Sequence, residues 1–219
     1  MTSKQLCITA LLLSFVAGAS SFAEQGEGTF AIGYAKPDGD FDRYAGTALL
    51  LSVRGNVHLA DGSPFGLWMG FQFMNFKYET QEVPYEHAGF DDTGTLTTKE
   101  QAYALMLGGQ FGSASTKAFF RPRIAGGLGM YLFVADRSLK VETISGEDEE
   151  VDSKVDDMRI RFGTHISIGA DFFFTPKWGL GLEIFYDYVW NLRQALGDTN
   201  EKVTGRYGGV ALCVVMPGT

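Results

Sequence analysis

The sequence predicts an all-β fold, an eight-stranded antiparallel up-and-down barrel that crosses a membrane. The first observation is an alternation on both sides of residues 175–178, where Ile166 and Ile168 share one strand face while His165 and Asp171 share the other. The second is the presence of eight such segments, and the third is a strict alternation of short and long connections between them. An apolar face opposite a charged face suits a barrel whose outer wall contacts lipid.

The eight segments that follow this period-2 pattern are, in chain order, residues 28–35, 47–59, 66–78, 101–111, 119–135, 158–174, 179–190 and 203–216. Several exceed the roughly 9 to 11 residues that cross a bilayer obliquely, so their ends should project beyond it as hairpins. The third segment is less regular because the apolar Phe73 shares its parity with Asn75 and Lys77. We expect a β-bulge near Met74, or a stretch that already lies beyond the membrane.

The connections between the segments are of two kinds. Residues 60–65, 112–118 and 175–178 are short and rich in Gly, Ser, Asp or Pro, whereas residues 36–46, 79–100, 136–157 and 191–202 are long and polar. Barrels of bacterial outer membranes have short periplasmic turns and long extracellular loops. With an even number of strands, both chain ends are expected on the short-turn side, in the periplasm.

The first 23 residues have the composition of a secretory signal peptide. Lys4 precedes an apolar core over residues 6–17, and we expect cleavage near Ala23. The core is shorter than the ~20 apolar residues of a spanning helix. Residues 24–219 are then a single outer-membrane β-barrel domain, in which Cys213 is the remaining cysteine and an intramolecular disulfide is excluded.

The charge of the chain bears on its partners. With a formal net charge of −8, the chain lacks the excess of basic residues that is typical of nucleic-acid-binding proteins. Residues 79–100 carry six acidic residues and one lysine, and residues 136–157 carry nine acidic and three basic residues. The run at residues 147–150 could collect divalent cations or a basic partner, and a simple solvated loop is the alternative.

A possible calcium site in the first long connection is rejected. The run DGDFD at residues 38–42 imitates the start of an EF-hand loop, but position six holds Arg43 and position twelve holds Leu49. The loop requires Gly and Glu at these places. We predict no metal site and no cofactor.

Charged residues on the face opposite the apolar one are expected to line the lumen. They include Arg54, Arg121, Arg123, Arg159, Arg161, Asp171, Glu183 and Asp187. Unpaired charges in a narrow lumen carry a large desolvation cost, so these groups should pair or hold water. The hairpin register through residues 175–178 predicts an ion-pair cluster of Arg123, Asp171 and Glu183, and Arg161 could meet Asp187.

Two uses of this network are open. The interior of an eight-stranded barrel is just wide enough for side chains, so the network is expected to fill and rigidify a closed lumen. A gated narrow pore, in which the same ion pairs change partners, is the alternative.

Three stretches carry a family resemblance: RPRIAGGLGMYLFV at residues 121–134, RFGTHISIGADFFFTPKWGLGLEIFYDYVW at 161–190, and GRYGGVALCVVM at 205–216. The chain resembles the small eight-stranded outer-membrane β-barrel proteins, a group that includes the OmpA membrane domain, OmpX-like proteins and opacity-type proteins. The resemblance implies a Gram-negative outer-membrane location and a non-catalytic role in envelope structure or surface recognition. It also implies contact with outer-membrane lipid and lipopolysaccharide, insertion by the barrel-assembly machinery, and a monomer. Members typically end in an aromatic residue, whereas this chain ends in residues 215–219, VMPGT.

A catalytic alternative rests on His165 and Ser167, with Glu183 or Asp187 on the next strand. Nucleophile, base and orienting acid are the ingredients of a serine hydrolase, and some eight-stranded barrels are lipid A deacylases with a His-x-Ser pair. The continuation after Ser167 and the spacing of the acid depart from that pattern. Because the pair faces the lumen, we expect no enzyme. A soluble periplasmic barrel that binds a small ligand is a further alternative, which would need an apolar lumen.

Overall fold

The computed structural model describes residues 26–43, 45–60, 63–77, 79–87, 90–113, 118–142, 148–151, 157–196 and 199–217. The predicted signal peptide, residues 1–23, lies outside these ranges. The described residues form β1 (Gly26–Asp38), the 3-10 helix η1 (Gly39–Arg43), β2 (Ala48–His58), β3 (Phe65–Phe76), β4 (Glu79–His87), β5 (Phe90–Gly112), β6 (Phe120–Glu142), β7 (Asp148–Val151), β8 (Asp157–Thr175), β9 (Trp178–Leu196) and β10 (Thr199–Pro217). No described helix is long and apolar enough to cross a membrane.

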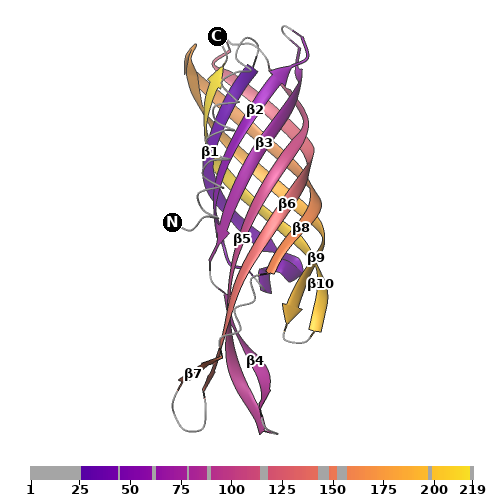
Figure 1. Ribbon diagram of the computed structural model, residues 1–219. Coiled ribbons are helices and arrows are strands. Elements are labelled where there is room, and N and C mark those ends of the chain that lie inside the picture. Colours follow the sequence, from indigo (N-terminus) through magenta and orange to yellow (C-terminus); the bar gives the residue numbers. More distant parts are fainter. Residues whose placement is uncertain are drawn as a thin grey trace, which may run out of the picture.

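Eight of the strands close into a barrel (Figure 1). Their order around it is β1-β2-β3-β5-β6-β8-β9-β10, all neighbours are antiparallel, and β10 pairs back with β1. Ala31 of β1, for example, lies opposite Cys213 of β10 on one side and Ser52 of β2 on the other. The predicted closed eight-stranded antiparallel barrel is therefore confirmed. The strands run obliquely to its long axis, as closure of a sheet requires.

A second, smaller sheet protrudes from the long-loop end. β5 and β6 each have 23 residues and remain paired beyond the barrel, up to Gly94 opposite Val141. There β4 pairs with the outer side of β5, and β7 pairs with the outer side of β6. We call these four strands the protruding sheet; Figure 1 shows β4 and β7 beyond the end of the barrel.

The prediction that residues 79–100, 136–157 and 191–202 are loops is wrong for much of their length. The protruding sheet occupies most of the first and part of the second, and in the third β9 and β10 stay paired up to Leu196 opposite Thr199. A β-ladder is made by backbone hydrogen bonds, which need no apolar face. The apolar alternation therefore ends where lipid ends, although the strands continue.

The predicted β-bulge near Met74 is also wrong. β3 keeps an unbroken register with β2 and with β5 from Phe65 to Asn75. Parity is constant along the strand: Met74 and Phe76 are buried in the lumen, while Asn75 faces outward at the loop-side end. The structure thus excludes the bulge, and the second expectation, that this stretch already lies beyond the membrane, stays a prediction.

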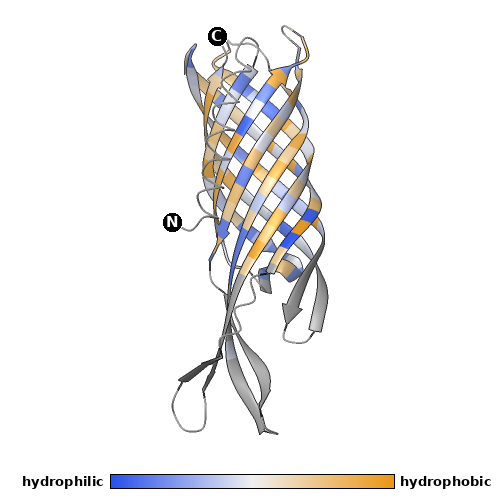
Figure 2. Cartoon of the chain, viewed as in Figure 1, coloured by the Kyte–Doolittle hydropathy of each residue, from blue (hydrophilic) through white to orange (hydrophobic). Residues whose placement is uncertain are grey.

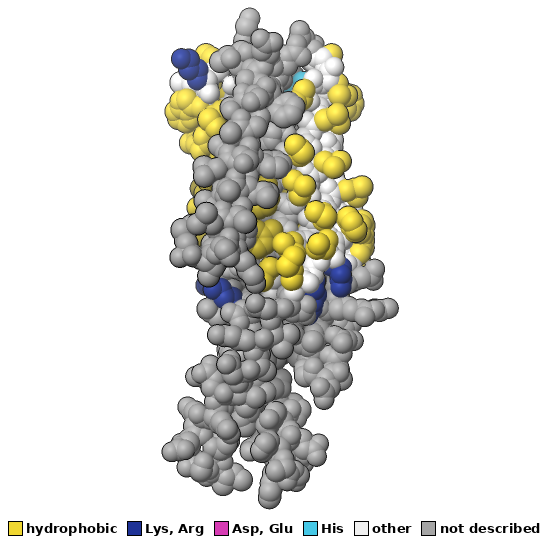
Figure 3. Space-filling model, viewed as in Figure 1, with side chains coloured by type: hydrophobic (Ala, Val, Ile, Leu, Met, Phe, Trp, Pro, Cys, Tyr) yellow, Lys and Arg dark blue, Asp and Glu magenta, His cyan; other side chains and the backbone are white. Residues whose placement is uncertain are grey.

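The outer wall of the barrel is apolar. Its exposed hydrophobic residues include Ile32, Leu107, Leu128, Ile160, Phe162, Ile168, Leu182 and Leu212. Hydropathy alternates along the strands in Figure 2, and Figure 3 shows apolar side chains over the wall with Lys and Arg at its margins. Aromatic rings gather near strand ends, where Phe174 lies 5.9 Å from Trp178 on the turn side and Tyr188 and Trp190 are exposed toward the loop side. This is the sidedness of a barrel in lipid.

Close approach between β5 and β6 depends on glycine. Gly108 lies opposite Gly127, and a Cβ on Gly108 would come within 2.1 Å of the carbonyl oxygen of Gly126. A Cβ on Gly127 would come within 2.8 Å of the indole of Trp68. The space left by these residues holds the Trp68 ring inside the barrel, where its Nε1 donates to the carbonyl of Gly109 at 3.0 Å.

Candidate functional site

The charged part of the lumen centres on Arg123 of β6. Its Nε donates to Asp171 Oδ2 at 3.0 Å, and its Nη1 donates to Glu183. Glu183 also accepts from Arg54 Nη2 of β2 at 2.7 Å. The structure thus brings together Arg123, Asp171 and Glu183, and adds Arg54 from the far side of the lumen. All four side chains are buried, so each ion pair is shielded from bulk water.

Arg121 forms a second group two residues nearer to the turn side. Its guanidinium pairs with Glu27 at 2.9 Å and stacks on the ring of Phe173, with 3.6 Å between Cζ and the ring centroid. Glu27 was missed by sequence reasoning because it precedes the first segment of regular alternation. Its position on the lumenal parity of β1 was the available signal.

A third group surrounds Asp187 of β9, which is 0 % exposed. This carboxylate accepts from Tyr131 Oη at 2.6 Å and from Gln72 Nε2 at 3.4 Å, and it lies 3.0 Å from His165 Nδ1. The β8–β9 register places His165 directly opposite Asp187, as predicted.

The expected contact of Arg161 with Asp187 is not formed. Arg161 lies four residues before His165 on β8, toward the long-loop end, and its Nη1 donates to the carbonyl of Ile160. A strand rises by about 3.3 Å per residue, so this offset is too long for the predicted contact.

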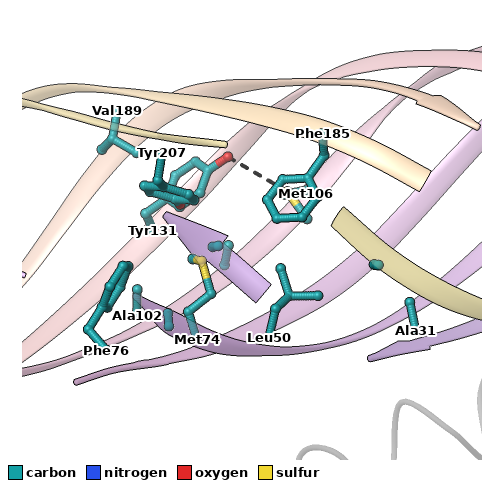
Figure 4. Close-up of a cluster of buried hydrophobic side chains, with 14 of the residues drawn as sticks. Ala31, Leu50, Met74, Phe76, Ala102, Met106, Tyr131, Phe185, Val189 and Tyr207 are labelled. Atoms are coloured by element: carbon teal, nitrogen blue, oxygen red, sulfur yellow. Dashed lines mark hydrogen bonds between the residues drawn. The ribbon is translucent and has the colours of Figure 1, made fainter. Parts of the chain in front are cut away.

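An aromatic layer fills the loop-side end of the lumen. Tyr131, Tyr207, Phe76 and Val189 converge there (Figure 4), and the Tyr131 hydroxyl also lies 3.7 Å from Met106 Sδ. Phe41 of η1 completes the layer, although η1 belongs to a connection and not to the barrel wall. The lumen therefore changes from ion pairs near the short turns to packed rings near the long loops.

The geometry does not assemble a hydrolase. His165 binds Asp187, but Ser167 Oγ is buried and makes no hydrogen bond to any described residue. Both side chains face the lumen, away from the lipid in which an acyl chain would lie. Within the described ranges, no three His, Cys, Asp or Glu side chains are grouped to hold a metal ion. The arrangement suits rigid, closed packing by charge pairs.

Solved structures of other proteins are similar to this chain at low sequence identity. Neisserial surface protein A is 12% identical with a TM-score of 0.51, over 89% of this chain and 97% of that one. A major outer membrane protein of Thermus thermophilus is 13% identical with a TM-score of 0.48, over 86% of this chain and 98% of that one. Ail of Yersinia pestis is 12% identical with a TM-score of 0.43, over 88% of this chain and 99% of that one. No curated protein matches the sequence.

A family model provides the assignment that these distant structural likenesses do not. The model described as outer membrane protein beta-barrel domain matches residues 7–206, which include seven strands of the wall and the start of β10, the lumenal charges and the protruding sheet. An apolar outer wall around enclosed ion pairs is what such a domain requires in its membrane. The chain belongs to the outer membrane protein β-barrel domain family and is an outer-membrane β-barrel protein.

Proposed function

We propose that this barrel is a non-catalytic recognition protein of the cell surface, and that the protruding sheet binds a basic partner. The supporting observation is the sheet itself. Among the described residues β4 pairs only with β5, and β7 pairs only with β6, so each has one edge with unpaired backbone groups. Such an edge can add an extended segment of another chain by backbone hydrogen bonds.

The sequence of the protruding sheet favours a positively charged partner. β4 reads ETQEVPYEH and β7 reads DEEV, and β5 contributes Asp91 and Asp92 near its start. An acidic surface raises the local concentration of basic groups and speeds their association. Divalent cations are the second class that these carboxylates could collect.

A role without catalysis is supported by the lumen. The polar groups that resemble catalytic residues are used in contacts inside the wall: Glu183 pairs with Arg54, and Asp187 lies within hydrogen-bond distance of His165. The apolar outer wall also speaks against the alternative of a soluble periplasmic barrel that binds a ligand.

Contact with phosphorylated lipid of the outer leaflet is the second part of the proposal. On the outer face of β3 and β5, residues of increasing polarity lie opposite each other toward the loop side: Phe71 and Leu105, then Phe73 and Tyr103, then Asn75 and Gln101. The rings of the second pair are 5.0 Å apart, and Gln101 Nε2 donates to Asn75 Oδ1 at 3.3 Å. Lys77 and Lys99 take the next outward positions. We call this series the β3–β5 ladder.

The order of the β3–β5 ladder matches the depth profile of a bilayer. Aromatic rings prefer the interface, and ammonium groups just beyond them reach lipid phosphates. The lipopolysaccharide of an outer leaflet offers such phosphates, so it is the lipid partner we propose.

Export and insertion complete the proposal. Residues 1–23 would be removed as a signal peptide, and the barrel-assembly machinery would insert the remaining chain as a monomer. N-terminal sequencing of the protein from outer membranes, expected to begin at Glu24, tests the cleavage.

The recognition proposal is tested with fluorescent polylysine as a basic probe on cells that display the protein. The double substitution Glu149→Gln with Glu150→Gln on β7 should weaken binding about fivefold, because two charge contacts of about 0.5 kcal/mol each are lost. Asp40→Asn with Asp42→Asn removes the same charge from η1 and serves as the matched control. Equal weakening by both variants, or none by either, would contradict a specific role of the protruding sheet.

A further inference from the structure

The first long connection sends an aromatic side chain into the barrel. η1 follows directly on β1 and begins with Gly39, whose φ of 62° lies in the left-handed region. A Cβ at Gly39 would also come within 2.3 Å of the Arg206 guanidinium, which would have to move, so the left-handed backbone is the main reason that glycine is favoured at this turn. The amide of Ala45 then donates to the carbonyl of Phe41 at 3.2 Å and returns the chain toward β2. Between these two points Phe41 is 0 % exposed.

Phe41 touches three different parts of the wall. Its ring centroid lies 5.5 Å from that of Phe76 on β3 and 6.0 Å from that of Phe133 on β6, both in edge-to-face geometry. On β10 the ring of Tyr207 lies 6.3 Å away. These strands are not neighbours in the barrel, so one side chain bridges the cross-section of the lumen. Edge-to-face contacts of this kind are each worth about 0.5–1.5 kcal/mol beyond area burial.

Beyond this aromatic layer the lumen is polar. The Asp187 carboxylate is the anionic group that contacts the layer, through its hydrogen bond with Tyr131. Further along, Ser167 Oγ, both amide atoms of Asn56 and Gln110 Oε1 are buried and make no hydrogen bond to described residues. Buried polar atoms without protein partners are normally satisfied by internal water. The aromatic layer, in which the Tyr207 hydroxyl also lacks a described hydrogen-bond partner, therefore lies between this polar, hydrated section of the lumen and the outer mouth.

We propose that η1 is a plug, in which Phe41 closes the loop-side end of a hydrated lumen. Displacement of η1 opens this end to small solutes, which would pass the buried side chains of Glu100 and Arg159, the latter opposite Phe133, before they reach Asp187. The plug is carried by a connection and is held by ring packing, so it can leave without breaking the β-ladders of the wall. This function goes beyond surface recognition, because it gives the barrel a solute path that is closed in the resting state.

The test uses a cysteine placed behind the plug. Ala104 is buried on β5, opposite Gln72 on one side and Tyr131 on the other, so Ala104→Cys puts a thiol beside the Asp187 group. Cys213→Ser removes the competing thiol. The purified barrel in detergent micelles is treated with a small cationic methanethiosulfonate reagent, and the labelling rate of the Ala104→Cys thiol is measured.

Adding Phe41→Ala should raise this rate at least tenfold. Phe162→Ala removes an exposed ring from the outer face of β8 and should leave the rate unchanged. Heat-modifiable gel mobility shows that each variant retains a closed barrel. If Phe41→Ala does not assemble, Phe76→Ala breaks the same ring contact from the wall side and carries the same expectation. A labelling rate in the assembled variant equal to that of the Phe162→Ala control would overturn the plug.

Discussion

Arg123 is the residue on which the charged section of the lumen depends most. Its guanidinium pairs with both Asp171 and Glu183. Glu183 also pairs with Arg54, whereas the cation that pairs with Asp171 among the described residues is Arg123. The guanidinium suits this place because it is planar and can serve two carboxylates at once. Removing one member of a buried ion-pair group leaves the others charged and poorly solvated.

We therefore expect Arg123→Met to lower the free energy of unfolding by about 3–5 kcal/mol, since Asp171 is left buried without its cation. Urea unfolding of the barrel in detergent, followed by tryptophan fluorescence, measures the change. In the double variant with Asp171→Leu much of the loss should be recovered, because the unpaired charge is removed as well. A double variant that is destabilised by the sum of the two single effects would show that the pair is not coupled.

Sequence reasoning reached part of this cluster and missed another part for a physical reason. Strand parity together with the β8–β9 turn is enough to bring Asp171 and Glu183 to diagonal positions on neighbouring strands, two residues apart in register. The contact between Arg54 and Glu183 joins β2 to β9 across the lumen. No hairpin register relates those two strands, so the sequence pattern names Arg54 as lumenal but cannot name its partner.

At the level of elements, the lipid-facing strands were predictable and their extensions were not. In the wall, period-2 alternation is imposed by lipid on one side and by ion pairs on the other, as along β8 and β9. In the protruding sheet the sequence is polar at most positions, as in ETQEVPYEH of β4, so no apolar face with period 2 marks the strand. Prediction from alternation therefore ends at the membrane boundary.

The β3–β5 ladder marks this boundary and gives a prediction for an element. Lys77→Gln with Lys99→Gln should weaken binding of phosphorylated lipid A in mixed micelles about fivefold, because two ammonium–phosphate contacts are worth about 1 kcal/mol together at an exposed site. Native mass spectrometry of the lipid-bound barrel measures the change. Lys177→Gln, in the β8–β9 turn, is the control and should have no effect. A variant that loses affinity equally for dephosphorylated lipid A would contradict recognition of the phosphate.

At the scale of the whole molecule, the sequence predicts which face of the wall is apolar and which is charged, but it does not predict that the lumen is closed. In every strand of the wall, the alternation of side chains shows which face is apolar. Each pattern is weak alone, but all eight together predict one barrel with an apolar outer face. The plug has no such pattern. Phe41 stands in the acidic run DGDFD, which resembles a solvated loop, and its burial depends on Phe76, Phe133 and Tyr207 from three distant segments.

Sidedness also sets the cost of a charge on the wall. Ile168 lies near the middle of β8, is 60 % exposed on the outer face and stands opposite Ile184. In lipid, Ile168→Arg should reduce the stability of the inserted barrel by about 2–4 kcal/mol, as expected for an arginine at the bilayer midplane. Folding into lipid vesicles at graded urea concentrations, followed by heat-modifiable gel mobility, measures this loss. Ile168→Leu keeps the wall apolar and should fold as the parent does. If the arginine variant inserted equally well, the apolar face would not be the one that contacts lipid, and the enclosed position of Arg123 and Asp171 would need another explanation.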